Sequence, residues 1–238
     1  MSATVSYTRD DVMAVAAARR LLDRTVCFVG IGLPSLACNL ARATHAPSAV
    51  LVYESGTIGA KPTRLPLSIG DGELAETADV VVSVPELFAY WLQGGRIDVG
   101  FLGAAQIDRH GNLNSTVIGP YEAPRVRLPG GGGAPEIATS AREVFVLLRQ
   151  SPRTFVDRLD FRTTVGERVS LVVTDLGILE PSAVDRELTL TQVHPGVDAG
   201  RVREETGWGL QVAEDLRETP APTRAELAAL RALKQGPS

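Results

Sequence analysis

Apolar and polar positions divide the first hundred residues into alternating helix-like and strand-like segments. Apolar side chains recur about one helical turn apart in residues 8–24, and Thr8 and Asp11 are placed to cap the start of that helix. Continuous runs of apolar and β-branched residues at 25–32 and 48–56 predict buried strands, with a helical segment between them. This alternation is typical of a parallel α/β sheet.

The rest of the chain continues this pattern and becomes richer in strands. Further strands are predicted at 79–84, 97–108, 143–150, 170–180 and 187–196, and further helices at 34–44, 85–95 and 223–234. Thr223 and Glu226 form a capping-box pattern at the start of the last helix. Because several strands are apolar throughout, we predict an open, mostly parallel α/β sheet that helices cover on both faces. No linker or internal repeat divides the sequence, so we expect a single domain over residues 1–238.

Composition and charge narrow the class of protein. Apolar residues make up 44% of the chain and charged residues 22%, which is ordinary for a globular protein, and the formal net charge is −4. Without a basic tract we expect no nucleic-acid binding, and without a run of about 18 apolar residues we expect no membrane span. The N-terminus lacks the order of a signal peptide, and Cys27 and Cys38 lie in apolar surroundings. We therefore expect a cytoplasmic protein without a disulfide framework.

A carboxylate follows the second buried strand directly. Glu54 comes after the apolar run, and Gly56 and Gly59 would let the backbone approach a ligand closely. Lys61 is near enough in sequence to meet an anionic group. Ligands of open α/β sheets bind beyond the carboxyl ends of the strands, which makes Glu54 a candidate site residue. A solvated surface glutamate is the competing interpretation.

Two glycine-rich segments could supply backbone N–H donors. Residues 30–35, "GIGLPS", lack the third glycine of the dinucleotide-binding fingerprint, but their position at a helix start suits an anion or a developing oxyanion. The four glycines Gly130–Gly133 are not followed by the Lys-Ser/Thr of a phosphate-binding P-loop. Donors that line a cleft are one interpretation of this second segment, and a flexible tether is the other.

Polar residues also follow the strand near residue 100. Gln106, Asn112 and Asn114 could shape a site there, although residues 110–112 also fit a plain hairpin turn. The three histidines are scattered and, with the two cysteines, give no metal-ligand spacing. The G-x-S-x-G elbow of serine hydrolases is absent from the sequence.

Taken in order, four segments resemble a known family. "GIGLPS", "YESGTIGAKP", "GGRIDVGFLGAAQIDRHGNLNS" and "GGGGAPEIA" resemble the β subunit of family I coenzyme A transferases, from about Val12 to about Leu233. They look closest to the branch that includes 3-oxoadipate and glutaconate CoA-transferases. Each segment alone is weak, and the combination is specific.

The resemblance implies roles for individual residues. The family's catalytic glutamate falls on Glu54, which would carry CoA as a glutamyl thioester in ping-pong catalysis. Oxyanion or CoA-binding amides would lie at Gly132 and Gly133, and also at Gly32 and Leu33. Lys61, Gln106, Asn112 and Asn114 are candidate contacts for substrate or CoA. The resemblance implies no metal and no cofactor, because the coenzyme A thioester is itself a substrate.

The resemblance also implies a partner and a reaction. A separate α subunit would complete the site at the junction of the two chains, in an α2β2 assembly. CoA would move from succinyl-CoA to a dicarboxylic acid, with 3-oxoadipate expected and glutaconate as the alternative. A CoA-ester ring-cleaving hydrolase of steroid breakdown and a regulatory module share the fold. One departure is the short loop at 166–168, where related chains carry a longer one.

Overall fold

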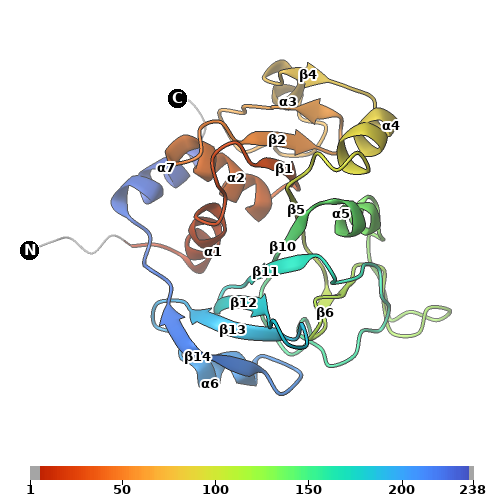
Figure 1. The fold of residues 1–238 in the computed structure, drawn as a ribbon, viewed down its shortest axis with the longest axis vertical. Coiled ribbons are helices and arrows are strands. Elements are labelled where there is room, and N and C mark those ends of the chain that lie inside the picture. The colour runs from red at the N-terminus through yellow and green to blue at the C-terminus, as the bar shows by residue number, and fades with distance from the viewer. Residues whose placement is uncertain (1–5, 236–238) are drawn as a thin grey trace, which may run out of the picture.

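The apolar runs of the sequence form one mixed sheet in this computed structural model, which describes residues 6–235. The sheet has ten strands in the order β14-β13-β12-β11-β10-β5-β1-β2-β3-β4 (Figure 1). Its strands are β1 (Val26–Val29), β2 (Val50–Tyr53), β3 (Thr57–Ile58), β4 (Val80–Val81), β5 (Val99–Leu102), β10 (Glu143–Leu147), β11 (Val169–Val173), β12 (Gly177–Pro181), β13 (Leu188–Val193) and β14 (Gln211–Glu218).

Short helices and two small hairpins complete the chain. The helices are α1 (Arg9–Ala18), α2 (Leu33–Thr44), α3 (Gly72–Glu76), α4 (Val84–Glu86), the π-helical turn η1 (Leu87–Leu92), α5 (Ala134–Ser140), α6 (Ala199–Glu204) and α7 (Arg224–Gln235). The hairpins pair β6 (Gln106–Ile107) with β7 (Leu113–Asn114) and β8 (Val117–Ile118) with β9 (Val126–Arg127). Of the helices within residues 6–235, none has the length and apolar character needed to cross a membrane.

The centre of the sheet is parallel, as the sequence predicts. Strands β11, β10, β5, β1 and β2 pair in parallel, whereas β3, β4 and β12 join through antiparallel pairs. Parallel strands place their carboxyl ends at one edge of the sheet. Residues that follow β1, β2 and β5 therefore meet at that edge, although they are far apart in sequence.

Helices cover both faces of the central strands, which confirms the predicted fold class. On β1, Cys27 and Val29 pack into a core with α1, α2 and α7, while Phe28 packs into a second core with α5 and η1. Figure 1 shows α1, α2 and α7 on one side of β5 and β10, and α5 on the other. Successive side chains of a strand point to opposite faces of the sheet. Because both faces are covered here, the residues on both must be apolar, which explains the continuous apolar runs in the sequence.

The predicted helix caps are present. Asp11 donates its backbone N–H to the Thr8 hydroxyl at 3.2 Å, and its carboxylate accepts from the Thr8 N–H at 2.8 Å. Thr223 and Glu226 exchange the same pair of bonds at the start of α7. The first helix ends at Ala18, however, and not at residue 24, and Leu22 beyond it is 74% exposed.

Three strand and helix predictions were only partly right. The strand at 79–84 is reduced to the two residues of β4, which are exposed because β4 is the outermost strand of the sheet. The segment 170–180 is two antiparallel strands, since the chain turns where Thr174 donates its N–H to the Gly177 carbonyl. The helix at 85–95 is the short α4 followed by the π-helical η1.

Candidate active site

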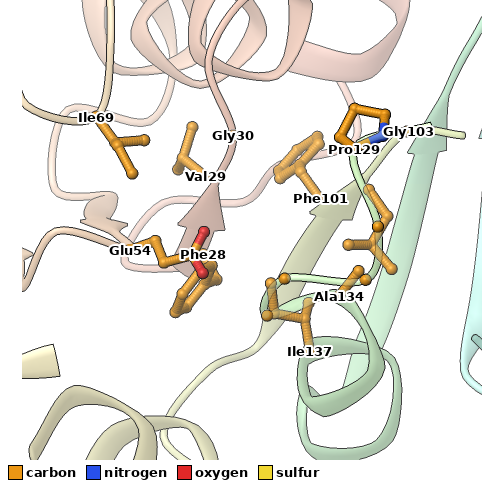
Figure 2. A pocket seen from close by; sticks show the side chains of 15 residues that line it. Phe28, Val29, Gly30, Glu54, Ile69, Phe101, Gly103, Pro129, Ala134 and Ile137 are labelled. Atoms are coloured by element: carbon orange, nitrogen blue, oxygen red, sulfur yellow. The ribbon is translucent and has the colours of Figure 1, made fainter. Parts of the chain in front are cut away.

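Glu54 lies at the carboxyl end of β2 and borders a cavity of about 260 Å³. The cavity is also lined by residues 28–30 at the end of β1, 101–103 at the end of β5 and 129–134 in the glycine-rich loop. Figure 2 shows the Glu54 carboxylate among side chains from these segments. In the sheet, β1 lies between β2 and β5. The chain connects β1 to β2 on one side and later returns to the other side as β5, so the cavity occupies a topological switch point of the sheet.

Gly133 makes room for the Glu54 carboxylate. A Cβ atom built on Gly133 would lie 2.9 Å from Glu54 Oε1 and 2.8 Å from Phe88 Cζ, and both distances are too short for real contacts. The carboxylate and the Phe88 ring therefore approach the same glycine. Here the structure brings together the candidate nucleophile and one of the two glycines expected to supply amides.

The glycine-rich loop has a fixed conformation next to Glu54. Gly130 donates its N–H to the Ser115 carbonyl at 2.8 Å, and the Ser115 hydroxyl donates to the Gly130 carbonyl at 2.9 Å. Gly130 and Gly132 have φ angles of 100° and 49°, which other residues rarely adopt. Within residues 6–235 the N–H groups of Gly132 and Gly133 donate to no protein acceptor, so both are available to a ligand.

Tyr53 fixes the end of β2 to α2, on the face of the sheet that α1, α2 and α7 cover. Its ring is completely buried, and its hydroxyl lies 3.0 Å from the Ser35 hydroxyl and accepts from the Asn39 amide at 3.3 Å, both on α2. Burial raises the pKa of Tyr53 to about 12, so this hydroxyl stays neutral at any ordinary pH. Tyr53 thus holds the residue before Glu54 firmly against a helix.

The residues just after Glu54 are buried and tightly packed. A Cβ on Gly56, whose φ is 98°, would lie 2.0 Å from the Val82 carbonyl oxygen. Val82 donates its N–H to the Gly56 carbonyl at 2.9 Å. The buried hydroxyls of Ser55 and Thr57 have no hydrogen-bond partner within the described part of the chain. The turn that carries Glu54 is therefore clamped by backbone contacts.

The second predicted pair of amides lies outside the cavity. Gly32 caps α2 with a φ of 88° and Leu33 begins the helix, and neither residue lines the space around Glu54. Gly30, two residues earlier, does line it. The "GIGLPS" segment thus reaches the cavity through its first glycine.

The predicted minor contacts are also separated from Glu54. Lys61 forms an ion pair with Asp79 and is half exposed, because the chain turns away at Gly59. Asn114 is fully buried, and its amide donates to Gln106 Oε1 and to the Val117 carbonyl, both at 2.7 Å. The side chains of all three residues therefore hold parts of this chain together.

Asn112 ties the β6–β7 hairpin to the short loop at 166–168. Its side-chain oxygen accepts from the Gly166 N–H at 3.0 Å, and its amide donates to Asp108 at 2.8 Å. Gly111, with a φ of 76°, makes the tight turn that the competing hairpin interpretation predicts. Asn112 is absent from the lining of the Glu54 cavity.

Sequence reasoning missed the apolar lining of the cavity. Phe28, Phe101 and Ile137 border it from β1, β5 and α5, and Ile69 borders it from the segment before α3. The positions of Phe28 and Phe101 near the ends of two buried strands were the available signal. Within residues 6–235 no cluster of three or more His, Cys, Asp or Glu side chains is placed to hold a metal ion.

Comparisons with known proteins identify the family of the chain. The family profile of the coenzyme A transferases matches residues 11–205. The chain is 60% identical to one of the subunits of 3-oxoadipate CoA-transferase from Pseudomonas knackmussii, over 96% of this chain and 94% of that relative. It is 31% identical to the corresponding subunit of glutaconate CoA-transferase from Acidaminococcus fermentans, over 97% and 94% of the two chains.

Solved structures show the same architecture. The crystal structure of glutaconate CoA-transferase from Acidaminococcus fermentans matches with a TM-score of 0.90 and 28% identity, over 96% of this chain and 95% of that one. The decarboxylase AibA/AibB matches with a TM-score of 0.88 and 31% identity, over 97% and 96%. The family profile and these full-length similarities together show that the chain belongs to the coenzyme A transferase family.

Proposed function

We propose that this chain is the β subunit of a CoA-transferase that moves CoA from succinyl-CoA to 3-oxoadipate, with Glu54 as the covalent nucleophile. The observation that carries the proposed chemistry is the approach of the Glu54 carboxylate to Gly133 inside the cavity. The acid is proposed from the relative at 60% identity, which is named a 3-oxoadipate CoA-transferase subunit.

The proposed reaction needs no oxidant and no net proton transfer. A Glu54 oxygen attacks the thioester carbonyl carbon of the acyl-CoA, the carbon–sulfur bond breaks, and an acyl-glutamyl anhydride and the CoA thiolate form. The thiolate then attacks the glutamyl carbonyl carbon, which releases the donor acid as its carboxylate and leaves CoA on Glu54 as a thioester. The acceptor carboxylate repeats the two steps in reverse, which gives ping-pong kinetics.

The surroundings of Glu54 fit the charge that develops in these steps. Each attack places negative charge on a carbonyl oxygen, and the N–H groups of Gly132 and Gly133, which no acceptor in residues 6–235 occupies, are candidate donors to it. Loss of one such donor typically reduces the rate by about 10²–10³. Once the partner subunit covers the cavity, its apolar lining would exclude water, strengthen these interactions and protect the anhydride from hydrolysis.

A separate α subunit is part of the proposal. The 60% identical relative is named as one subunit of its enzyme, and the structural relative AibA/AibB is named as a pair of chains. We expect the α chain to close the Glu54 cavity and to contribute to recognition of the acid, in an α2β2 assembly.

Acceptor-dependent transfer by the α–β complex tests the proposal. We expect the complex to convert succinyl-CoA and 3-oxoadipate to 3-oxoadipyl-CoA and succinate, and to use glutaconate poorly. A complex that carries Glu54→Ala should lose transfer completely.

Three results would replace the proposal. Release of free CoA from a CoA ester without any acid acceptor would indicate a hydrolase, and loss of CO₂ from the substrate would indicate a decarboxylase. Faster transfer to glutaconate than to 3-oxoadipate would make glutaconate the proposed acceptor acid. The fold alone does not separate these activities, because the decarboxylase AibA/AibB shares it.

A further inference from the structure

Phe88 lies on a π-helical turn that is anchored next to Glu54. In η1 the N–H of Gln93 donates to the Phe88 carbonyl at 2.8 Å, five residues back, and Arg96 donates in the same way to Trp91. Leu87 and Leu92, also five residues apart, are completely buried. The wider turn therefore directs two successive leucine anchors into the core and fixes the position of Phe88 beside them. Such turns occur frequently at functional sites.

The segment that carries Phe88 is also held against the turn that follows Glu54. Val82, which leads into α4 and η1, clamps Gly56 through its backbone N–H and carbonyl. Between Val82 and Phe88, Ser83 and Glu86 form a capping box that fixes the start of α4. The chain thus runs rigidly from a contact two residues after Glu54 to the Phe88 ring.

The edge of the Phe88 ring faces the point that the carboxylate approaches. The Cβ position of Gly133 lies 2.8 Å from Phe88 Cζ, 3.1 Å from Phe88 Cε1 and 2.9 Å from Glu54 Oε1. Cζ and Cε1 are ring-edge atoms, and the edge of an aromatic ring carries partial positive charge. Phe28, which lines the cavity, supports the ring in an edge-to-face arrangement with centroids 5.9 Å apart.

We propose that Phe88 is a positioning residue, whose ring edge holds the Glu54 carboxylate in the orientation that attacks the thioester. This inference rests on the proposed function of Glu54 as nucleophile. An anionic carboxylate attracts the positive ring edge, while the ring excludes water from one side of it. Gly133, whose Cβ position both groups approach, leaves room for the carboxylate beside the ring and next to the cavity. A misplaced nucleophile reduces the rate of its own attack more than it weakens binding of the substrate.

Single-turnover kinetics of the assembled α–β complex test this role. The measured quantity is the rate at which saturating acyl-CoA places CoA on Glu54, together with the acyl-CoA concentration that gives half of the maximal rate. We expect Phe88→Ala and Phe88→Leu to slow the maximal rate by about 10-fold to 100-fold. The half-saturating concentration should change less than about threefold, because the substrate-binding surface is retained. Tyr90→Ala is the matched control, since Tyr90 lies on the same turn and is 65% exposed.

Each alternative outcome is distinct. An unchanged maximal rate in both variants would overturn the inference, and so would a higher half-saturating concentration at full rate, which would make Phe88 a substrate contact. A normal rate in Phe88→Leu with a slow Phe88→Ala would assign the effect to apolar volume and overturn the role of the ring edge. If Phe88→Ala fails to fold, Phe88→Leu decides alone. Failure of the proposed function would appear in the unmodified complex, as absence of CoA on Glu54.

Discussion

At the scale of single residues, the site depends on close packing around the Glu54 carboxylate. Glu54 follows a strand end that Tyr53 fixes to α2, and Gly56 follows it under the Val82 backbone. The carboxylate itself approaches Gly133, as does the edge of the Phe88 ring. In our proposal, the absence of a side chain at these two glycines and the presence of one aromatic ring set the orientation of the nucleophile.

Gly133→Ala should slow transfer by the α–β complex by about 100-fold without unfolding this chain. The added methyl group would meet Glu54 Oε1 at 2.9 Å and Phe88 Cζ at 2.8 Å, so the carboxylate must move. A displacement of about 1 Å can reduce the rate by about 100-fold. Transfer activity and the thermal unfolding midpoint are the measurements. Gly209→Ala is the control, because a Cβ there meets nothing within 4 Å, and equal activity of the two variants would contradict the assignment.

Thr57→Val should leave stability unchanged or raise it by about 1 kcal/mol, since the Thr57 hydroxyl is buried and has no partner among the residues that the structure describes. Thr174→Val is the opposite case, because the Thr174 hydroxyl donates to Gln150 and accepts from the N–H groups of Leu176 and Gly177. That variant should lose about 1–3 kcal/mol, because buried groups lose their partner. Denaturant unfolding measures both, and a clear loss in Thr57→Val would reveal a partner for its hydroxyl.

Sequence alone could predict Glu54 and the Gly130–Gly133 loop as site residues because each follows or precedes a recognisable element. It could not predict where Lys61 lies, since the turn at Gly59 directs it toward Asp79. Nor could it show that the Asn114 amide donates to Gln106 inside the protein, while the Gln106 amide donates to Asp160. A polar residue after a strand can bind a ligand or can form hydrogen bonds within the protein. The sequence alone does not distinguish these two roles.

At the scale of elements, the Glu226 carboxylate links α7 to the end of α1 on one face of the sheet. Glu226 caps α7 by accepting from the Thr223 N–H, and it accepts from Arg19 Nε and Nη2 at the end of α1, both at 2.7 Å. Burial alone would raise the pKa of Glu226, but the bonds from Arg19 and Thr223 outweigh it and lower that pKa. The ionised carboxylate therefore stabilises the folded state.

Glu226→Gln should destabilise the protein at neutral pH by about 1–2 kcal/mol, because glutamine can keep the capping bond to the Thr223 N–H but loses the charge-assisted bonds from Arg19. Solvent partly screens the Arg19 pair, so the loss should stay below that of breaking a fully buried ion pair. The folded-state pKa lies below the unfolded value, so the contribution is complete above about pH 4.3 and is lost as the pH falls through the lower pKa. Urea unfolding at neutral and acidic pH measures the difference, and an equal loss at both pH values would contradict this account.

The sequence predicts elements well where burial dictates them and poorly at the edges of the sheet. The runs that became β1, β2, β5 and β10 are apolar on both faces, and only a covered strand explains them. Strand β14 was missed because most of its residues are exposed and polar, so its pairing with β13 leaves no apolar pattern. The π-helical turn was missed because an α-helix and a π-helix differ by only one residue in hydrogen-bond spacing. Over six positions the two leave similar patterns of apolar residues.

At the scale of the whole molecule, this chain presents the proposed nucleophile in a cavity that opens to its surface. Glu54 is half-buried, and Gly132 and Pro129 at the cavity are exposed. The proposed partner subunit would close this side.

We therefore expect the isolated chain to show less than about 1% of the transfer rate of the complex, because the anhydride needs a closed site. Titration of the α chain into the isolated chain should restore the rate up to equimolar amounts. Full activity of this chain alone would contradict a shared site.

The most direct test of the central claim is the detection of CoA on Glu54. The α–β complex is incubated with succinyl-CoA without acceptor, digested at mild pH, and analysed by mass spectrometry. We predict a peptide containing Glu54 that carries CoA in thioester linkage, which disappears when 3-oxoadipate is added and never forms in Glu54→Ala. A complex that transfers CoA at full rate while Glu54 stays unmodified, or while alanine replaces it, would contradict the account.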